Sequence, residues 1–465
     1  MTTQCTVKPI VLQAENGRDC VATFDGGTIC SDAGVLLLKR VEQATGIIRQ
    51  FAACFTDHRD PERIEHSLYE LIAQRVYALA LGYEDLNDHD VLRHDPLLAA
   101  LVGKKDPNKE PLAGKSTLNR LELTPVGADA DSRYKKIVVH RRDVDRFFVE
   151  AFVQSYDSPP ECLILDLDAT DDPVHGDQLG KFFHGYYGHY CYLPLYIFCG
   201  DHLLCARLRP ADIDGAAGSV LELDRIVGQI RQAWPDVQIL VRGDSGFCRD
   251  EIMDWCERHD VDYVLGLARN ARLVREIETE LAQVRQIVDV TGQAARVYKE
   301  FSYQTLDSWS RSRRVVGKAE VLPQGDNPRF VVTSLSSEHR QAQSLYEDLY
   351  CGRGEMENRI KEQQLYLFAD RTSCATMRAN QTRLWFSSVA YTLLEALRRM
   401  GLKGTVLAQA TCQTIRLKLL KIGAQIQVTV RKIWVRLSQS YPYQMLFRQI
   451  DGNLTTCCRG HPLRC

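Results

Sequence analysis

Two apolar runs that lead into aspartates constrain the fold of this chain most strongly. Residues 162–167 are largely apolar and precede Asp168, and residues 237–241 precede Arg242-Gly243-Asp244. Short apolar runs that end in polar or glycine residues are typical of buried strands. In open α/β sheets, groups that bind ligands gather at the carboxyl ends of the strands. The sequence therefore predicts a sheet that brings Asp168 and Asp244 to one edge.

The order of expected strands and helices along the chain predicts the fold class. From residue 162 onward, strands come first as hairpin-like runs at 190–199 and 202–209, with Gly200-Asp201 as the turn signal. Strands then alternate with helices expected over 220–233 and 250–259, followed by a strand over 263–267. This order predicts an α/β fold with an RNase H-like mixed sheet flanked by helices.

The pattern divides the chain of 465 residues into several parts. Helical spacing over 67–82 predicts a helical front domain, and strand-like runs after residue 295 predict a β-rich insertion. A long helix over 342–367 is expected to return the chain to the core. We expect an N-terminal helical DNA-binding domain at 1–150, the first part of the catalytic core at 160–270, a mostly β insertion at 271–336, core completion at 337–400, and a basic C-terminal region at 401–465.

A third acidic residue, Glu357, lies on the long predicted helix. Tyr350, Arg353, Glu357 and Lys361 are spaced by 3, 4 and 4 residues, which predicts that all four share one helix face. Two strand-end carboxylates and one helix carboxylate suit a pair of Mg²⁺ ions, with Mn²⁺ as a substitute, because hard cations prefer oxygen ligands. The neighbouring cations, Arg353 and Lys361, could then bind phosphate groups.

Nearby acids compete for each of these roles. Asp166 points to the same sheet face as Asp168, because strand side chains alternate with a period of two. Glu355 and Glu362 compete with Glu357. Two further groups of residues have side chains of the metal-ligating type. They are Asp172, His175, Asp177, His184 and His189, which fit a loop over the active site better, and Cys457, Cys458, His461 and Cys465 at the tail.

Charge is distributed unevenly along the chain. The net charge is only −2, but residues 371–465 carry 15 Lys or Arg against 2 acids, 15 − 2 = +13. A segment this basic favours a polyanionic partner over a solvated helical face. The 16 cysteines are scattered without a secretory signal, and no apolar run is long enough for a membrane helix. We expect reduced thiols, no membrane association and a cytoplasmic protein.

These motifs resemble those of the DDE transposases of bacterial insertion sequences. One branch of that family carries Tyr, two residues, Arg, three residues, Glu, six residues and Lys; Tyr350, Arg353 and Glu357 match this order and spacing. Gln364 stands where the final Lys is expected, and Lys361 lies one turn earlier. Asp168-Ala169-Thr170 resembles the first-acid motif and Asp244 the second, and residues 82–88 resemble the front region of this group.

The resemblance implies cleavage at the ends of a mobile element and strand transfer into target DNA. Asp168, Asp244 and Glu357 would be catalytic and hold the metal, and Tyr350, Arg353 and Lys361 would contact the DNA backbone. It implies double-stranded DNA with terminal inverted repeats as the partner, a homodimer on that DNA, and association with the bacterial nucleoid. A nuclease that does not join DNA, and an idle DNA-binding descendant, are the alternatives.

A separate hypothesis concerns one aromatic residue of the insertion. Trp309 lies beside Arg311, Arg313 and Arg314. Its ring could stack on an unpaired base, and a core or surface aromatic is the simpler interpretation.

Overall fold

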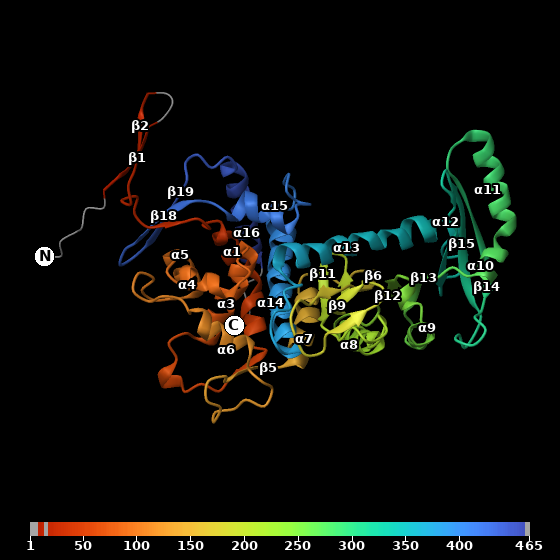
Figure 1. The fold of residues 1–465 in the computed structure, drawn as a ribbon, viewed down its shortest axis with the longest axis horizontal. Coiled ribbons are helices and arrows are strands. Elements are labelled where there is room, and N and C mark those ends of the chain that lie inside the picture. The colour runs from red at the N-terminus through yellow and green to blue at the C-terminus, as the bar shows by residue number, and fades with distance from the viewer. Residues whose placement is uncertain (1–7, 14–16, 461–465) are drawn as a thin grey trace. The chain divides into compact units, whose positions relative to one another are not determined.

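The computed structural model describes residues 8–13 and 17–460. The chain forms two compact units (Figure 1). Unit 1 comprises Met1–Arg49, Pro61–Asn119 and Ala396–Cys465, and unit 2 comprises Gln50–Asp60 and Arg120–Glu395. Both ends of the sequence thus contribute to unit 1, whereas the residues predicted to be catalytic all belong to unit 2.

Unit 1 is mainly helical, as the front part of the sequence predicts. Helix α3 shows why. The Ser67 hydroxyl accepts a hydrogen bond from the Glu70 amide (3.2 Å), the Glu70 carboxylate accepts one from the Ser67 amide (2.7 Å), and Gly82 ends the helix with a φ of 95°. The described elements of this part are β1 (Ile10–Gln13), β2 (Asp19–Ala22), β3 (Ile29–Cys30), α1 (Val35–Thr45), α2 (Ile47–Ala52), α3 (Leu68–Leu81), α4 (His89–Leu92), α5 (Pro96–Val102), α6 (Lys115–Glu122), α15 (Cys412–Ile415), β18 (Ala424–Val428), β19 (Ile433–Leu437) and α16 (Gln444–Gly460).

Unit 2 is built on a large mixed sheet. Strand β6 (Cys162–Ala169) pairs antiparallel with β10 (Leu195–Cys199), which pairs antiparallel with β11 (His202–Arg207). On its other side β6 is parallel to β12 (Gln238–Gly243), and β12 is parallel to β13 (Asp262–Leu267). The predicted α/β class, a mixed sheet flanked by helices, is confirmed.

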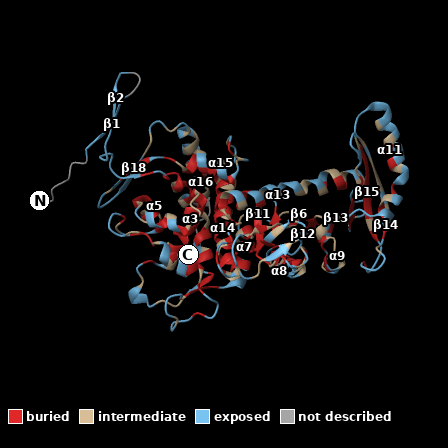
Figure 2. Cartoon of the chain, in the orientation of Figure 1, coloured by how far each residue is buried: buried red, intermediate tan, exposed pale blue. Residues whose placement is uncertain are grey.

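Helices cover both faces of this sheet. Alternate β6 residues Leu163, Leu165 and Leu167 enter one core cluster with residues of α7 (Arg141–Val153), α8 (Ser219–Ala233) and α9 (Asp250–Arg258). On the opposite face the Phe198 and Tyr391 rings meet edge to face at 5.9 Å, which places α14 (Met377–Ala396) there. Figure 2 shows these sheet strands and α14 as largely buried.

The segment predicted as a β insertion continues the same sheet. Strand β17 (Arg329–Thr333) pairs antiparallel with β13, and β15 (Arg313–Leu322) and β14 (Ala295–Tyr303) follow, with the short β16 (Gly325–Asp326) at the end of β15. Helices α10 (Ala271–Glu276) and α11 (Glu278–Thr291) pack against these strands.

Trp309 is a core residue of this region. Its side chain is only 6% exposed, and its ring meets that of Tyr303 edge to face at 5.8 Å. The core interpretation is confirmed, and the hypothesis that this ring stacks on an unpaired base is wrong.

The single strand predicted at 190–199 is also wrong. Strand β9 (His189–Tyr192) belongs to a separate small sheet with β7 (Asp172–Pro173) and β8 (Phe182–His184), and β10 starts anew at Leu195. Pro194 separates the two strands, because proline has no amide hydrogen to offer to a strand ladder. The adjoining strand ends at Arg207, two residues before the predicted end. The small sheet follows directly after the first predicted acid.

The long helix predicted over 342–367 is present, but it is irregular. After α12 (Ala342–Ser344) the chain makes wide π-type turns at Leu345–Tyr350 and a tight 3₁₀ turn at Cys351–Arg353. Regular helix resumes as α13 (Gly354–Lys361), followed by another π segment at Glu362–Tyr366. The 3, 4, 4 spacing that assumed a uniform helix therefore does not describe the face on which Tyr350 lies.

A buried ion pair fixes this helix on the sheet. The Arg242 side chain (residue 7% exposed) donates from Nε to Asp166 Oδ1 at 2.5 Å and from Nη2 to Oδ2 at 2.8 Å. Its Nη1 donates to the Leu349 carbonyl oxygen in the π-type turn. A methyl group at Gly352 would lie 2.7 Å from Nη1, so only glycine leaves room for the guanidinium. Strands β6 and β12 and the helix are thereby tied together.

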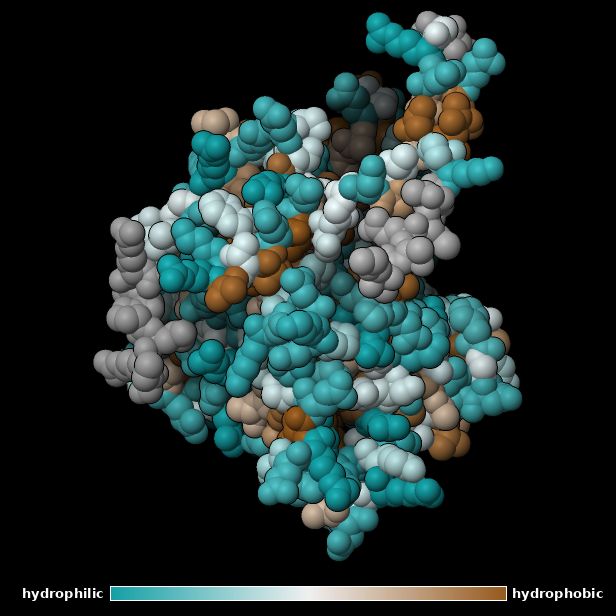
Figure 3. All heavy atoms as spheres, turned by 90° about the vertical axis from the view of Figure 1, so that its left-hand side faces the viewer, coloured by the Kyte–Doolittle hydropathy of each residue, from teal (hydrophilic) through white to brown (hydrophobic). Residues whose placement is uncertain are grey.

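Two expectations concern the remaining surface and the tail. Within the described residues, no helix is at once long and apolar enough to span a membrane. Figure 3 views the side that lies to the left in Figure 1 and shows mainly hydrophilic residues with separate hydrophobic groups. Of the tail cluster, His461 and Cys465 lie outside the described residues, as does the side chain of Cys458.

We expect Arg242→Met to lower the free energy of unfolding by about 3–5 kcal/mol, because it leaves the buried Asp166 carboxylate without its partner. The matched control is Arg249→Met, which removes an arginine from an exposed pair with Asp214 (2.8 Å, side chains 41% and 48% exposed) and should cost less than about 1 kcal/mol. Urea unfolding followed by circular dichroism measures both. Equal small losses would show that the buried pair does not hold the helix.

Candidate active site

The sheet places Asp168 and Asp244 side by side. Asp168 is the penultimate residue of β6, and Asp244 follows the last residue of β12. These strands are parallel neighbours, with Leu167 paired to Gly243, so the two aspartates stand at the same level, about 4.8 Å apart in strand spacing. The predicted convergence at the carboxyl edge is observed.

Glu357 joins them from α13 through an arginine. Arg353 Nη2 donates to Glu357 Oε1 at 2.8 Å, and Arg353 Nη1 lies 3.6 Å from Asp168 Oδ2. The guanidinium thus stands between the carboxylates of the first and third acids. Glu357 keeps a side chain that is 44% exposed, whereas that of Asp168 is 16% exposed. The site is therefore open on the helix side and closed on the strand side.

The carboxyl group of Asp168, the first acid, has a raised pKa. Burial raises the pKa of Asp168 to about 7, and the negative charges of Asp244 and Glu357 act in the same direction while Arg353 opposes them. The burial of Asp168 and the repulsion that it meets from two neighbouring carboxylates favour the binding of a cation, which would relieve both. The donor set of carboxylate oxygens fits Mg²⁺ or Mn²⁺.

The described residues nevertheless contain no ready-made cluster of three His, Cys, Asp or Glu ligands. Arg353 gives the physical reason, because its guanidinium occupies the space between Asp168 and Glu357. Movement of one side chain would open that space.

Tyr350 lies close to the second acid. A methyl group at Gly266 of β13 would lie 2.5 Å from the Tyr350 hydroxyl oxygen and 2.9 Å from the Ser245 amide nitrogen. Burial raises the pKa of Tyr350, and the charge of Asp244 adds to that effect while Arg353 opposes it. The tyrosine hydroxyl therefore stays protonated at neutral pH and can donate a hydrogen bond beside Asp244.

The remaining predicted cation stands apart from the acids. Lys361 is exposed at the end of α13. Gln364, which replaces the lysine expected from the family signature, donates to the Asp171 carbonyl and to Asp172 Oδ1, both at 3.0 Å. Gln364 therefore anchors the helix to the segment after the first acid and does not face solvent as a cation would. Among the described residues, Lys361 has no carboxylate within ion-pair distance.

Two of the three rival acids have other partners. Asp166 is paired with Arg242, and the buried Glu362 accepts a hydrogen bond from Arg359 at 2.7 Å. Glu355 is exposed on α13. The geometry thus separates Asp168 from Asp166, although strand alternation alone could not.

The competing His and Asp residues around the small sheet do not form one centre in the described structure. His189 Nε2 lies 2.7 Å from Asp171 Oδ2, and Asp177 pairs with Lys181 at 3.0 Å. Asp172 is fully buried, and burial raises its pKa well above the usual range. These residues hold the small sheet and the helix in place.

Sequence reasoning missed two positions that shape the site. Arg242 interrupts an apolar strand two residues before Asp244, and a charged residue inside a buried strand signals a buried partner. Gly266 interrupts the strand over 263–267, and a glycine inside a strand signals close approach of another group. Both signals were visible in the sequence, but their partners, Asp166, Leu349 and Tyr350, were not.

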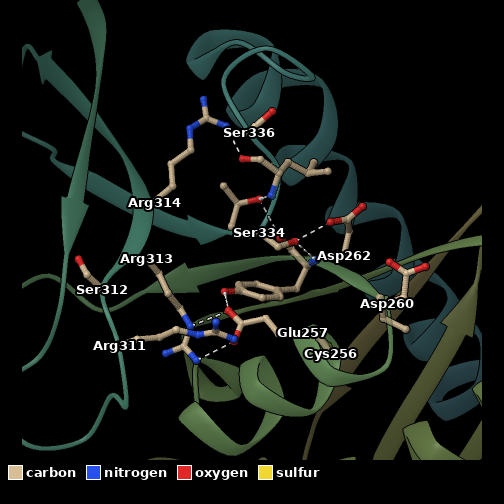
Figure 4. A pocket seen from close by; sticks show the side chains of 14 residues that line it. Cys256, Glu257, Asp260, Asp262, Arg311, Ser312, Arg313, Arg314, Ser334 and Ser336 are labelled. Carbon is tan, nitrogen blue, oxygen red and sulfur yellow. Dashed lines mark hydrogen bonds and ion pairs between the residues drawn. The ribbon is translucent and has the colours of Figure 1, made fainter.

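A polar cavity of about 450 Å³ lies elsewhere (Figure 4). It borders Asp262, which begins β13, and so lies at the edge of the sheet opposite Asp244. Its arginines are ion-paired: Arg313 Nε donates to Glu257 at 2.9 Å, and Arg311 also pairs with Glu257. Arg314 pairs with Glu300, which lies outside the lining. Balanced charges of this kind indicate a structural network.

The chain is similar to known proteins in structure and in sequence. Among solved structures, the chain is similar to the piggyBac transposase in its synaptic complex with hairpin DNA, at 12% identity and a TM-score of 0.40, over 93% of this chain and 83% of that chain. No curated protein matches the sequence. The model of the family described as "Transposase DDE domain group 1" matches residues 12–457. Because that match covers nearly the whole length, the chain belongs to this family of DDE transposases.

Proposed function

We propose that the protein is an active transposase that cleaves the ends of a bacterial insertion sequence and transfers the freed strands into target DNA. The observation that carries the proposal is the convergence of Asp168, Asp244 and Glu357 around Arg353 at one edge of the sheet. Membership of the DDE transposase family supports it. The order β11-β10-β6-β12-β13, antiparallel and then parallel, supports an RNase H-like catalytic core.

In this proposal Asp168, Asp244 and Glu357 hold Mg²⁺, with Mn²⁺ as a substitute. When bound, the metal would activate a water or 3′ hydroxyl and stabilise the leaving oxygen. The residues around the acids have separate tasks. Arg353 compensates the acids while no cation is bound and then offers its guanidinium to a phosphate. Tyr350 donates its hydroxyl beside Asp244, and Lys361 contacts the DNA backbone.

The DNA partner is double-stranded, with element ends and target DNA held by a homodimer. The C-terminal basic segment supports the DNA part of this proposal only in its exposed portion. Buried or paired members serve the fold: Arg416 donates to the Ala80 carbonyl at 2.9 Å, and Lys421 pairs with Asp32 at 2.6 Å. The exposed members on the β18–β19 hairpin are Arg431, Lys432 and Arg436. Positive charge at a solvent-exposed ribbon suits the DNA backbone.

Substitution of the acids tests the proposal. We expect Glu357→Gln and Asp244→Asn to reduce Mg²⁺-dependent cleavage of DNA carrying the element's terminal repeats at least about a hundredfold. Loss of a metal ligand should reduce the rate of cleavage at least as much as loss of a side chain that only orients such a ligand. DNA binding, measured by gel shift, should remain.

The control is Glu355→Gln, which alters an exposed acid on the same helix and should leave cleavage within about twofold. Equal loss in both glutamate variants would contradict the assignment of Glu357. Cleavage without joining in the unmodified protein would favour the nuclease, and specific binding without cleavage would favour the idle descendant.

The titration of Asp168 predicts how metal binding depends on pH. Its folded pKa of about 7 exceeds the ordinary 3.8, so the metal-free protein loses stability as pH rises from about 4 to 7 and the carboxylate becomes charged. Mg²⁺ binds the charged form, so its affinity should rise up to about tenfold per pH unit below 7 and level off above it.

We therefore expect a larger rise in melting temperature on adding Mg²⁺ at pH 8 than at pH 6. Asp168→Asn should remove the difference between the two pH values. A Mg²⁺ effect in the unmodified protein that is the same at both would show that Asp168 does not titrate on metal binding.

A further inference from the structure

A second cavity in unit 2, of about 580 Å³, lies at the same sheet edge as the acids. Its wall includes Arg207, the last residue of β11. Arg207 pairs with Leu195 of β10, which pairs with Ala169, the neighbour of Asp168. Two strand spacings of about 4.8 Å separate Arg207 from Ala169 along this edge. The backbone of Arg207 in the cavity wall therefore lies about 10 Å along the edge from the neighbour of the first acid.

The floor of the cavity is apolar. Leu208 and Trp385, each 4% exposed, line it together with Val139 and Met377. The volume lies in the range of ligand pockets and is much larger than a phosphate group needs. An apolar floor of this size suits a flat, largely apolar group such as a nucleobase.

The cations of the wall fall into two groups. Arg207 is buried and paired with Asp145 at 2.6 Å and Glu222 at 3.0 Å, and Arg141 lies 3.5 Å from each of the same two acids. This network is largely balanced within the protein. It fixes the wall and leaves the recognition of an anion to other residues.

Arg142 and Arg378 form the second group. Among the described residues neither has a carboxylate within ion-pair distance, and the buried Nη2 of Arg378 has no hydrogen-bond partner. Burial lowers the pKa of Arg378, with no acid to offset that effect. Asp143, the acid in the wall, lies 3.9 Å from Arg146. A half-buried guanidinium with an unsatisfied donor favours an anionic ligand.

The segments that carry these cations also connect to the active site. Arg378 lies in the first turn of α14, and the chain just before it accepts a hydrogen bond at the Ala375 carbonyl from the Leu179 amide (3.0 Å). Leu179 lies between β7 and β8 of the small sheet. At a rise of about 3.4 Å per nucleotide, the 10 Å offset corresponds to about three nucleotides of a DNA strand.

We propose that this cavity binds one unpaired nucleotide of the DNA strand that passes the acidic site, with its phosphate on Arg378 and Arg142 and its base on the apolar floor. The inference rests on the proposed function, because it takes DNA as the substrate. It adds a binding site that does not include the catalytic acids.

Fluorescence titration with 2-aminopurine deoxyribonucleoside 5′-monophosphate tests this site without requiring cleavage. We expect the monophosphate to bind more tightly than the free deoxynucleoside and to be displaced only weakly by inorganic phosphate. Arg378→Gln should weaken binding of the monophosphate about tenfold and Arg142→Gln about threefold, since charged hydrogen bonds to phosphate are lost. Binding of the free deoxynucleoside should stay unchanged in both.

Two controls keep the outcomes distinct. Arg249→Gln, which removes an exposed arginine outside the cavity, and Asp168→Asn should both leave monophosphate binding intact. Arg142 is exposed, so its variant remains informative even where Arg378→Gln fails to fold. Loss of binding in Asp168→Asn but not in the arginine variants would place the nucleotide at the acids and overturn the inference. Binding that persists while the unmodified protein fails to cleave DNA would overturn the proposed function alone.

Discussion

The buried pair of Arg242 and Asp166 is the interaction on which the candidate active site depends. Removing two charges from water costs several kcal/mol per ion, and the pair is tolerated only when every donor and acceptor is satisfied. Here the two Arg242–Asp166 hydrogen bonds join neighbouring strands, and the third donor, Nη1, binds the Leu349 carbonyl oxygen in the π-type turn. The same guanidinium thus completes the sheet and fixes the helix that carries Glu357.

The irregular helix follows from this contact. Wide turns are uncommon within helices and occur frequently at functional sites. Gly352 admits the Arg242 guanidinium, and Gly266 admits the Tyr350 hydroxyl. With these two close approaches, Tyr350 lies beside Asp244, while Arg353 bridges Asp168 and Glu357. A uniform helix with the same sequence would direct these side chains differently.

Opposite charges are separated along one edge of the sheet. The carboxylates stand at the ends of β6 and β12. Arg142 and Arg378, which have no acidic partner among the described residues, line the cavity that also includes the last residue of β11. A cation at the first position and a phosphate at the second would each meet a complementary field. By contrast, the polar cavity at the other edge contains arginines that are paired with nearby acids. Charge balance, more than cavity size, distinguishes a binding site from a structural network.

The sequence by itself determined the strands that end at Asp168 and Asp244, the alternation that predicts a mixed α/β sheet, and the helix that carries Glu357. These features depend on local hydrophobic period and on the end of each strand, which neighbouring residues encode. Only the tertiary structure decided between Asp166 and Asp168, because both point to the same face and only one meets Arg242. It also decided that Trp309 is buried, that Gln364 is an anchor, and that the buried Nη2 of Arg378 has no hydrogen-bond partner among the described residues. Such outcomes depend on contacts between residues far apart in the chain. The spacing of neighbouring residues does not determine which distant group will pack beside a given side chain.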